Sequence, residues 1–181
     1  MRKIDFFDGQ ITKIRNIVGA SINFFNERLN EPDRKKGCYL VIMEAQTSHI
    51  ILIIRLGEPA GDKDNRHLNT AMCIATVVYN RQETDLSSHE SRNELGGFPA
   101  GAVLCDDLIW SINGLGAKNS EAVATVLAIE YTNMENNPAI FRKNKMFEKI
   151  SSWNDQIPQL INYLAGSNTI STHCQKMARV N

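Results

Sequence analysis

The sequence feature that most constrains the fold is a pair of hairpin-like segments with a helical stretch between them. Each segment has two short apolar runs around polar turn residues: Cys38–Met43 with Ile50–Leu56, and Ala102–Cys105 with Leu108–Ile112. Short runs rich in isoleucine and valine, joined by a polar turn, are typical of β-hairpins. Neither of the first two runs alternates cleanly, so both faces of those strands are expected to be at least partly covered. In the second segment, Asp106 and Asp107 are interpreted as turn formers.

Three stretches predict helices around these hairpins. Apolar residues recur every three or four positions over residues 10–30 and again over residues 68–80, which is the period of an amphipathic helix. A third helix is predicted over residues 121–134, with Asn119 or Ser120 as its N-cap. The order helix, hairpin, helix, hairpin, helix predicts an α+β fold, in which helices pack on a central antiparallel sheet of four or five strands made from the two hairpins.

The chain of 181 residues is long enough for one domain with a sizeable core. We expect residues 1–134 to form the α+β unit, and residues 135–181 to be a C-terminal helical extension and tail of the same domain. In this extension, Asp155 is expected to cap a short helix with Pro158 in its first turn. Residues 167–181 are predicted to be a loosely held tail, and the polar segment 81–94 an exposed loop.

Glycines flank the second hairpin on both sides: Gly96, Gly97 and Gly101 before it, and Gly114 and Gly116 after it. They are expected to let the chain turn into and out of the sheet. A phosphate-binding loop requires the pattern GxxxxGK[ST], in which Lys118 has no matching place. The stretch "GLGAKN" also lacks the third glycine of a dinucleotide fingerprint. The sequence therefore does not favour nucleotide binding.

Charge and composition narrow the classes of partner. Twenty basic and twenty acidic residues cancel, so no global field attracts nucleic acid or an anionic membrane. The N-terminal stretch "MRKIDFFDGQ" carries acids where a secretory signal needs an apolar run, and no window of about 18 apolar residues could span a bilayer. We therefore expect a cytoplasmic protein with no nucleic-acid or membrane partner.

The four cysteines give no metal-site pattern. No CxxC pair is present, which argues against a zinc ribbon. Cys38, Cys73 and Cys105 lie within apolar segments, where a free cysteine usually acts as a small buried hydrophobe. No metal ligand is assigned from the sequence.

Two short motifs resemble a known family. The order of the elements, with "GGFP" before the last hairpin and "SINGLG" after it, resembles the GlcG-like family of small haem-binding proteins, which includes the C-terminal domain of PduO-type proteins. Gly96, Gly97 and Pro99 match the family's Gly-Gly-x-Pro motif. Residues 112–115 match its strand end, with Asn113 where serine is common. The resemblance covers roughly residues 10–134; the family's lysine in the middle helix is absent here, and the C-terminal extension is additional.

The resemblance implies a cytoplasmic, non-enzymatic protein that binds a small ligand and assembles as a homo-oligomer. Haem or another tetrapyrrole is its candidate ligand; in that case a histidine would coordinate the iron while apolar sheet residues cover the macrocycle. The candidate ligand-binding residues are His67, near the start of the middle helix, His89 in the polar loop, and Gly96 and Gly97. No catalytic residue is assigned.

Two other function classes remain open. One is an enzyme acting on a small metabolite with His67 as acid or base, because Asp62, Asp64 and Arg66 surround it in sequence. The other is a scaffolding subunit that binds no ligand. A serine hydrolase is not favoured: Ser87, Ser88, His89 and Glu90 are adjacent in sequence, whereas a triad brings its base from elsewhere, and no GxSxG motif is present.

The surface that would carry self-association is also left open by the sequence. Phe141 and Phe147 lie in the stretch "NPAIFRKNKMF". Either a second copy of the chain covers these aromatic side chains, or the C-terminal helices fold back and bury them within one chain.

Overall fold

The predicted α+β fold is confirmed by the computed structural model, which describes residues 3–59, 64–82, 87–90, 101–132 and 140–177. Within these residues, four strands form one antiparallel sheet in the order β2-β1-β4-β3. The strands are β1 (Gly37–Glu44), β2 (Ile50–Gly57), β3 (Ala102–Cys105) and β4 (Leu108–Asn113). The helices are α1 (Lys3–Asn26), α2 (Asp64–Asn80), α3 (Ala117–Thr132), α4 (Ile140–Ser151), α5 (Gln156–Gly166) and α6 (Thr172–Met177), with a short 3-10 turn at Glu31–Asp33.

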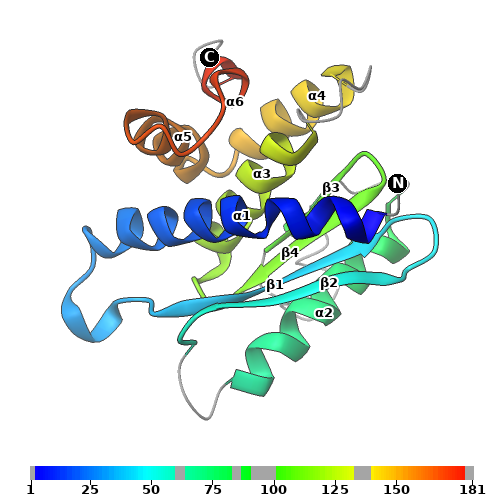
Figure 1. Cartoon of the computed structure of the whole chain (residues 1–181), viewed down its shortest axis with the longest axis horizontal. Coiled ribbons are helices and arrows are strands. Elements are labelled where there is room, and N and C mark those ends of the chain that lie inside the picture. Colours follow the sequence, from blue (N-terminus) through cyan, green and yellow to red (C-terminus); the bar gives the residue numbers. More distant parts are fainter. Residues whose placement is uncertain (1–2, 60–63, 83–86, 91–100, 133–139, 178–181) are drawn as a thin grey trace.

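The helices form layers on the two faces of the sheet (Figure 1). Helix α2 packs on one face, against β1, β3 and β4, and helices α1 and α3 pack on the other. Helices α5 and α6 lie over α3 on the side away from the sheet. The C-terminal extension therefore adds a further helical layer to the side of the sheet that already carries α1 and α3.

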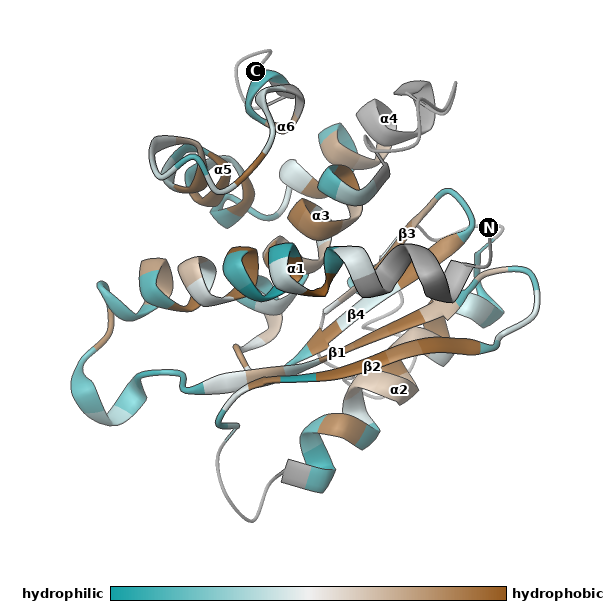
Figure 2. Ribbon diagram, in the orientation of Figure 1, coloured by the Kyte–Doolittle hydropathy of each residue, from teal (hydrophilic) through white to brown (hydrophobic). Residues whose placement is uncertain are grey.

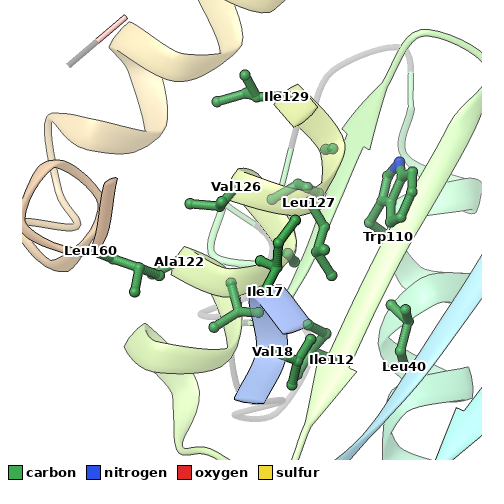
Figure 3. Close-up of a cluster of buried hydrophobic side chains, with 14 of the residues drawn as sticks. Ile17, Val18, Leu40, Trp110, Ile112, Ala122, Val126, Leu127, Ile129 and Leu160 are labelled. Carbon is green, nitrogen blue, oxygen red and sulfur yellow. The ribbon is translucent and has the colours of Figure 1, made fainter. Parts of the chain in front are cut away.

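The main core lies between the sheet and this helical side (Figure 3). It joins side chains from five elements: Ile17 and Val18 of α1, Leu40 of β1, Trp110 and Ile112 of β4, Val126 and Leu127 of α3, and Leu160 of α5. Burial of this apolar surface is the dominant favourable term in folding. Because α5 contributes to the same cluster as the sheet, the extension shares one core with the α+β unit.

The two hairpins lie where the apolar runs predicted them, but the covering of their faces differs. Seven of the eight residues of β1 are buried, whereas β2 is half exposed. Both faces of β1 are covered, whereas β2 is covered only in part: Ile54 and Leu56 are buried, and Ile53 and Arg55 are exposed. The reason is position: β2 is at the end of the sheet, and α2 packs mainly on β1, β3 and β4. Figure 2 shows that both β1 and β2 are largely hydrophobic, so the difference in their exposure does not come from their composition.

Helix α3 begins four residues earlier than predicted. Gly116 has a φ of +89°, and its carbonyl accepts the first helical hydrogen bond from the Ser120 amide at 2.8 Å. Asn119 and Ser120 therefore lie inside the helix, and the prediction that one of them is its N-cap is wrong. Asp155 precedes α5 as expected but makes no side-chain capping hydrogen bond; the Gln156 amide donates instead to the Asn154 side-chain oxygen at 3.2 Å.

The predicted loose tail is wrong for its first half. Ile170 and Cys174 are buried, and residues 172–177 form α6. The backbone N–H and hydroxyl of Ser171 both donate to the Glu130 carboxylate, at 3.0 and 2.8 Å, and Lys13 pairs with the same carboxylate at 2.5 Å. This buried carboxylate ties the extension to α1 and α3, which sequence polarity alone did not indicate.

One glycine after the second hairpin is required by its surroundings. Gly114 has a φ of +127°, and a Cβ at this position would lie 2.8 Å from the Gly37 carbonyl oxygen and 2.9 Å from the Cys38 Cα. Few L side chains adopt this backbone region, and the start of β1 leaves no room for one. The predicted role of Gly114 at the exit from the sheet is confirmed, whereas Gly96 and Gly97 lie outside the described residues.

Candidate functional site

The first candidate site lies where α2 meets the end of β4. His67 is half buried in the first turns of α2, and its Nδ1 lies 2.7 Å from Oδ1 of Asn113, the last residue of β4. Asn113 shares a face of the sheet with Ser111, whose hydroxyl donates to the Ala71 carbonyl of α2 at 2.7 Å. The structure therefore joins a histidine that the sequence marked as a candidate to the strand end that carries the "SINGLG" motif.

This hydrogen bond determines the chemistry of the imidazole. An amide oxygen only accepts, so Nδ1 carries the proton and donates to Asn113. In the neutral ring Nε2 then has the lone pair, which is the form that binds a metal or accepts a proton. A histidine that binds a metal through one ring nitrogen usually donates the N–H of its other nitrogen to a second group in this way.

Two apolar side chains of α2 follow His67 closely in the sequence. Leu68 and Met72 of α2 are partly buried and pack against Tyr39 and Val41 of β1. Of Asp62, Asp64 and Arg66, the charged residues close to His67 in the sequence, only Arg66 has a described side chain. Arg66 is exposed, while Asp62 and the Asp64 side chain lie outside the described part of the chain.

The segment around His89 is not the exposed loop that the sequence predicted. Ser87 and Ser88 are buried, with 0% and 2% of their surface exposed. The Ser88 hydroxyl accepts hydrogen bonds from the Gly101 and Ala102 amides, at 3.0 and 3.1 Å. Ser87 also bridges to Val103 of β3. The prediction of an exposed loop is wrong for residues 87–88 because these serines complete the edge of β3, so their polarity reflects backbone partners rather than solvent.

His89 itself lies against the C-terminal extension. Its ring stacks on Trp153 with centroids 5.0 Å apart and an angle of 15° between the planes. Trp153 follows α4 and donates through its indole N–H to Oε2 of Glu121 in α3, at 3.2 Å. Asn154 donates to the same oxygen at 3.0 Å. We call Ser87, His89, Glu121, Trp153 and Asn154 the Glu121 cluster.

Glu121 is the electrostatically unusual member of the cluster. Its side chain is fully buried, and burial raises the pKa of its carboxyl above the usual value. Hydrogen bonds from Asn154 and Trp153, the nearby Ser87 hydroxyl and the charge of His89 lower this pKa only in part. Within the described residues, Oε1 has no hydrogen-bond partner of regular geometry. The cluster therefore holds a carboxyl whose two oxygens differ in their environment.

The structure does not bring the two candidate histidines together. His67 lies on the face of the sheet that α2 covers, whereas the partners of His89 lie on and over α3, on the opposite face. A small cavity lies between α1, α3 and β4 and is lined in part by Lys13, Trp110 and Glu130. It contains no histidine, and its volume of about 10 Å³ is the room of roughly one water molecule. It is too small for a tetrapyrrole.

Three of the four cysteines are buried: Cys38, Cys105 and Cys174. Burial raises the pKa of the Cys38 thiol to about 12, so this thiol stays protonated at neutral pH. Cys73 is exposed on α2, and the prediction that it is a buried hydrophobe is wrong. Among the described residues, no group of three or more histidine, cysteine, aspartate or glutamate side chains is arranged to hold a metal ion.

Comparison of the chain with protein-family models, with curated proteins and with solved structures finds no match. The similarity to the GlcG-like family therefore stays a prediction from the quoted motifs. None of the helices in the described ranges combines the length and the apolar character needed to cross a bilayer.

The sequence did not single out the residues at the centre of the Glu121 cluster. Glu121, Trp153 and Asn154 come from two segments more than 30 residues apart. One signal was available: residues 122–129 of α3, which follow Glu121, are apolar apart from Thr125. A helix segment that is apolar on nearly all sides is usually buried. An acid at its start is then also buried, which is rare for glutamate unless it has partners.

Proposed function

We propose that this protein binds a small ligand at the junction of α2 and β4, with His67 as the residue that contacts it. Haem or another tetrapyrrole is the ligand that the resemblance to the GlcG-like family suggests. The observation that carries the proposal is the 2.7 Å hydrogen bond between His67 Nδ1 and Asn113 Oδ1, because it presents the Nε2 lone pair.

The residues at this place fit an iron macrocycle in their donor chemistry. His67 would supply a nitrogen ligand to the iron, and Asn113 would hold its ring and tautomer. Leu68 and Met72 of the same helix pack against β1 but stay partly exposed, and they would offer apolar surface to the macrocycle. The group itself would supply redox or ligand chemistry at its iron; the chain supplies a ligand, its orientation and an apolar surface.

A haemin titration followed at the Soret band tests the proposal. We expect saturable binding at one site per chain, and we expect His67→Ala to remove the shifted band. Asn113→Ala should raise the dissociation constant by about 10-fold, because loss of a group that orients a ligating histidine typically has an effect of this size.

Matched controls use the other histidines. His49 is exposed in the turn between β1 and β2, so His49→Ala should leave the titration unchanged. His89→Ala should also leave it unchanged, because His89 stacks on Trp153 on the other side of the sheet. Loss of binding in His89→Ala but not in His67→Ala would show that the site is misplaced, and no saturable binding to the wild type would exclude the tetrapyrrole.

A second candidate is an enzyme that acts on a small metabolite with His67 as its acid or base. The same hydrogen bond favours it, since an imidazole held through Nδ1 presents Nε2 to a substrate proton. Such an enzyme would bind a metabolite without a Soret band and would lose turnover in His67→Ala. A scaffolding subunit would show neither behaviour.

A further inference from the structure

The exposed outer strand of the sheet is the most unusual surface of the described chain. Among the described residues, two large apolar residues are exposed to solvent: Ile50, with 42% of its surface exposed, and Ile53, with 44%. Both belong to β2, whose sequence is IILIIRLG. A long apolar strand at a sheet edge is a template for pairing with another strand, and monomeric proteins usually protect such an edge with charges, proline or bulges. β2 has one charge, Arg55, and one irregularity, where Ile42 of β1 pairs with Leu52 but Met43 pairs with Ile50. From Leu52 to Leu56 its register with β1 is regular.

The two edges of the sheet differ. The edge formed by β3 is extended by the bridge from Ser87 to Val103. The edge formed by β2 is the end of the strand order, and no described strand pairs with its outer side. Pairing of β2 with β2 of a second copy gives a closed two-fold dimer, because the same edge of both chains is then used.

The charges of the strand allow this pairing with itself. Arg55 is the only charged residue of β2, and the whole chain has a formal net charge of zero, so two copies do not repel each other overall. A two-fold axis through Ile53, perpendicular to the sheet, places Ile53 beside its copy. The same axis places the two Arg55 side chains on opposite sides of the Ile53 pair, so they do not lie opposite each other.

The face of β2 toward α2 also has room for a partner. Ile53 pairs with Val41 of β1, and Val41 packs against Ala71 of α2. Helix α2 covers β1 there but packs mainly on β1, β3 and β4, so Ile53 remains exposed at the border of the helix. In an antiparallel pair, directly opposite side chains lie about 5 Å apart, so the two Ile53 side chains would cover each other.

From these observations we propose that a second copy of this chain pairs antiparallel with β2, about a two-fold axis at Ile53, and so forms one continuous eight-stranded sheet across two chains. The proposal does not depend on ligand binding at His67. It identifies β2, rather than the segment around Phe147, as the contact between copies. Phe147 is buried in its own chain with 2% exposed, and the Phe141 side chain lies outside the described residues.

Sedimentation of the purified chain over a wide range of concentration tests the proposal. The wild type is expected to have twice the mass of one chain. Ile53→Lys places two ammonium groups face to face at the axis and should raise the dissociation constant of the dimer by about 100-fold or more. Asn162→Lys adds the same charge on the exposed side of α5 and should leave the dimer unchanged.

Cross-linking checks the register without relying on one variant. In a Cys73→Ser background, Ile53→Cys should give an intermolecular product with a short thiol-specific cross-linker, whereas Asn162→Cys should not. Far-UV circular dichroism confirms that each variant is folded. A wild type that stays monomeric at every concentration overturns the proposal. So does a folded Ile53→Lys variant that remains as dimeric as the wild type, or a dimer in which Ile53→Cys fails to cross-link.

Discussion

Replacing Gly114 with alanine is expected to lower the free energy of unfolding by about 4 kcal/mol, from backbone strain and overpacking together. The backbone at this position has a φ of +127°, which an L residue rarely adopts. The added methyl group would also lie 2.8 Å from the Gly37 carbonyl oxygen and 2.9 Å from the Cys38 Cα. Both are backbone atoms, so relief requires the start of β1 to move away from the end of β4.

Two other glycines separate these contributions. Gly116 has a φ of +89° and no neighbour within 4 Å of the added Cβ, so Gly116→Ala should cost only the strain, about 1–2 kcal/mol. Gly19 is exposed in α1 with no neighbour within 4 Å, and Gly19→Ala should stabilise the protein by about 0.5–1 kcal/mol through helix propensity.

Urea unfolding followed by tryptophan fluorescence measures all three variants, because Trp110 is buried in the main core with 1% exposed. The expected order of stability is Gly19→Ala, wild type, Gly116→Ala and Gly114→Ala, from highest to lowest. Equal losses for Gly114→Ala and Gly116→Ala would mean that the contact with β1 contributes nothing and that strain alone matters at the exit from the sheet.

The hairpins were predictable because their signals are local. A short apolar run with a polar turn contains both strands and their connection, and the structure pairs Cys38 with Leu56 and Cys105 with Leu108 as such runs imply. The exposure of β2 was not predictable in the same way. Which strands a helix covers depends on how the whole sheet is ordered, and that order joins β1 to β4 across more than 60 residues.

The candidate sites show the same difference between local signals, which the sequence reveals, and long-range contacts, which it does not. His67 was a candidate because a histidine near the start of a helix attracts attention by its chemistry alone, but its partner Asn113 is 46 residues away. Ser87 and Ser88 look like solvent-facing residues, since sequence polarity is the same whether a hydroxyl bonds water or a buried amide. The buried environment of Glu121 is a property of the packed helix α3 and the extension together, and no local pattern describes it.

Glu121 provides the second large effect. Glu121→Ala would leave the Trp153 indole N–H and one Asn154 N–H without their acceptor. It would also leave a cavity where the Glu121 side chain was. Buried groups without partners are costly, and we expect a loss of about 3–5 kcal/mol. Urea unfolding at neutral pH measures it, and a loss below about 1 kcal/mol would contradict the account, because that is the size of one ordinary hydrogen bond.

Glu121→Gln separates the charge from the hydrogen bonds. The amide keeps an oxygen for Trp153 and Asn154 but needs no ionisation in a buried place. Because the pKa of Glu121 is raised on folding, the folded state holds the proton more tightly than the unfolded state. The contribution of this group is therefore most favourable below its usual pKa and falls as pH rises toward and through the raised value. Glu121→Gln should remove this fall and be about 1 kcal/mol more stable than the wild type at neutral pH.

Glu130→Gln is the matched control for this change, because Glu130 is buried in the same helix but has charged and polar partners. Its carboxylate pairs with Lys13 and accepts two hydrogen bonds from Ser171. Removing that charge leaves Lys13 without its partner, so Glu130→Gln should destabilise the protein at neutral pH by about 1–2 kcal/mol. The same substitution on one helix is thus expected to have opposite signs at two positions. Destabilisation by both would mean that the charge of Glu121 is compensated after all, and that the His89 side of the cluster supplies more attraction than burial removes.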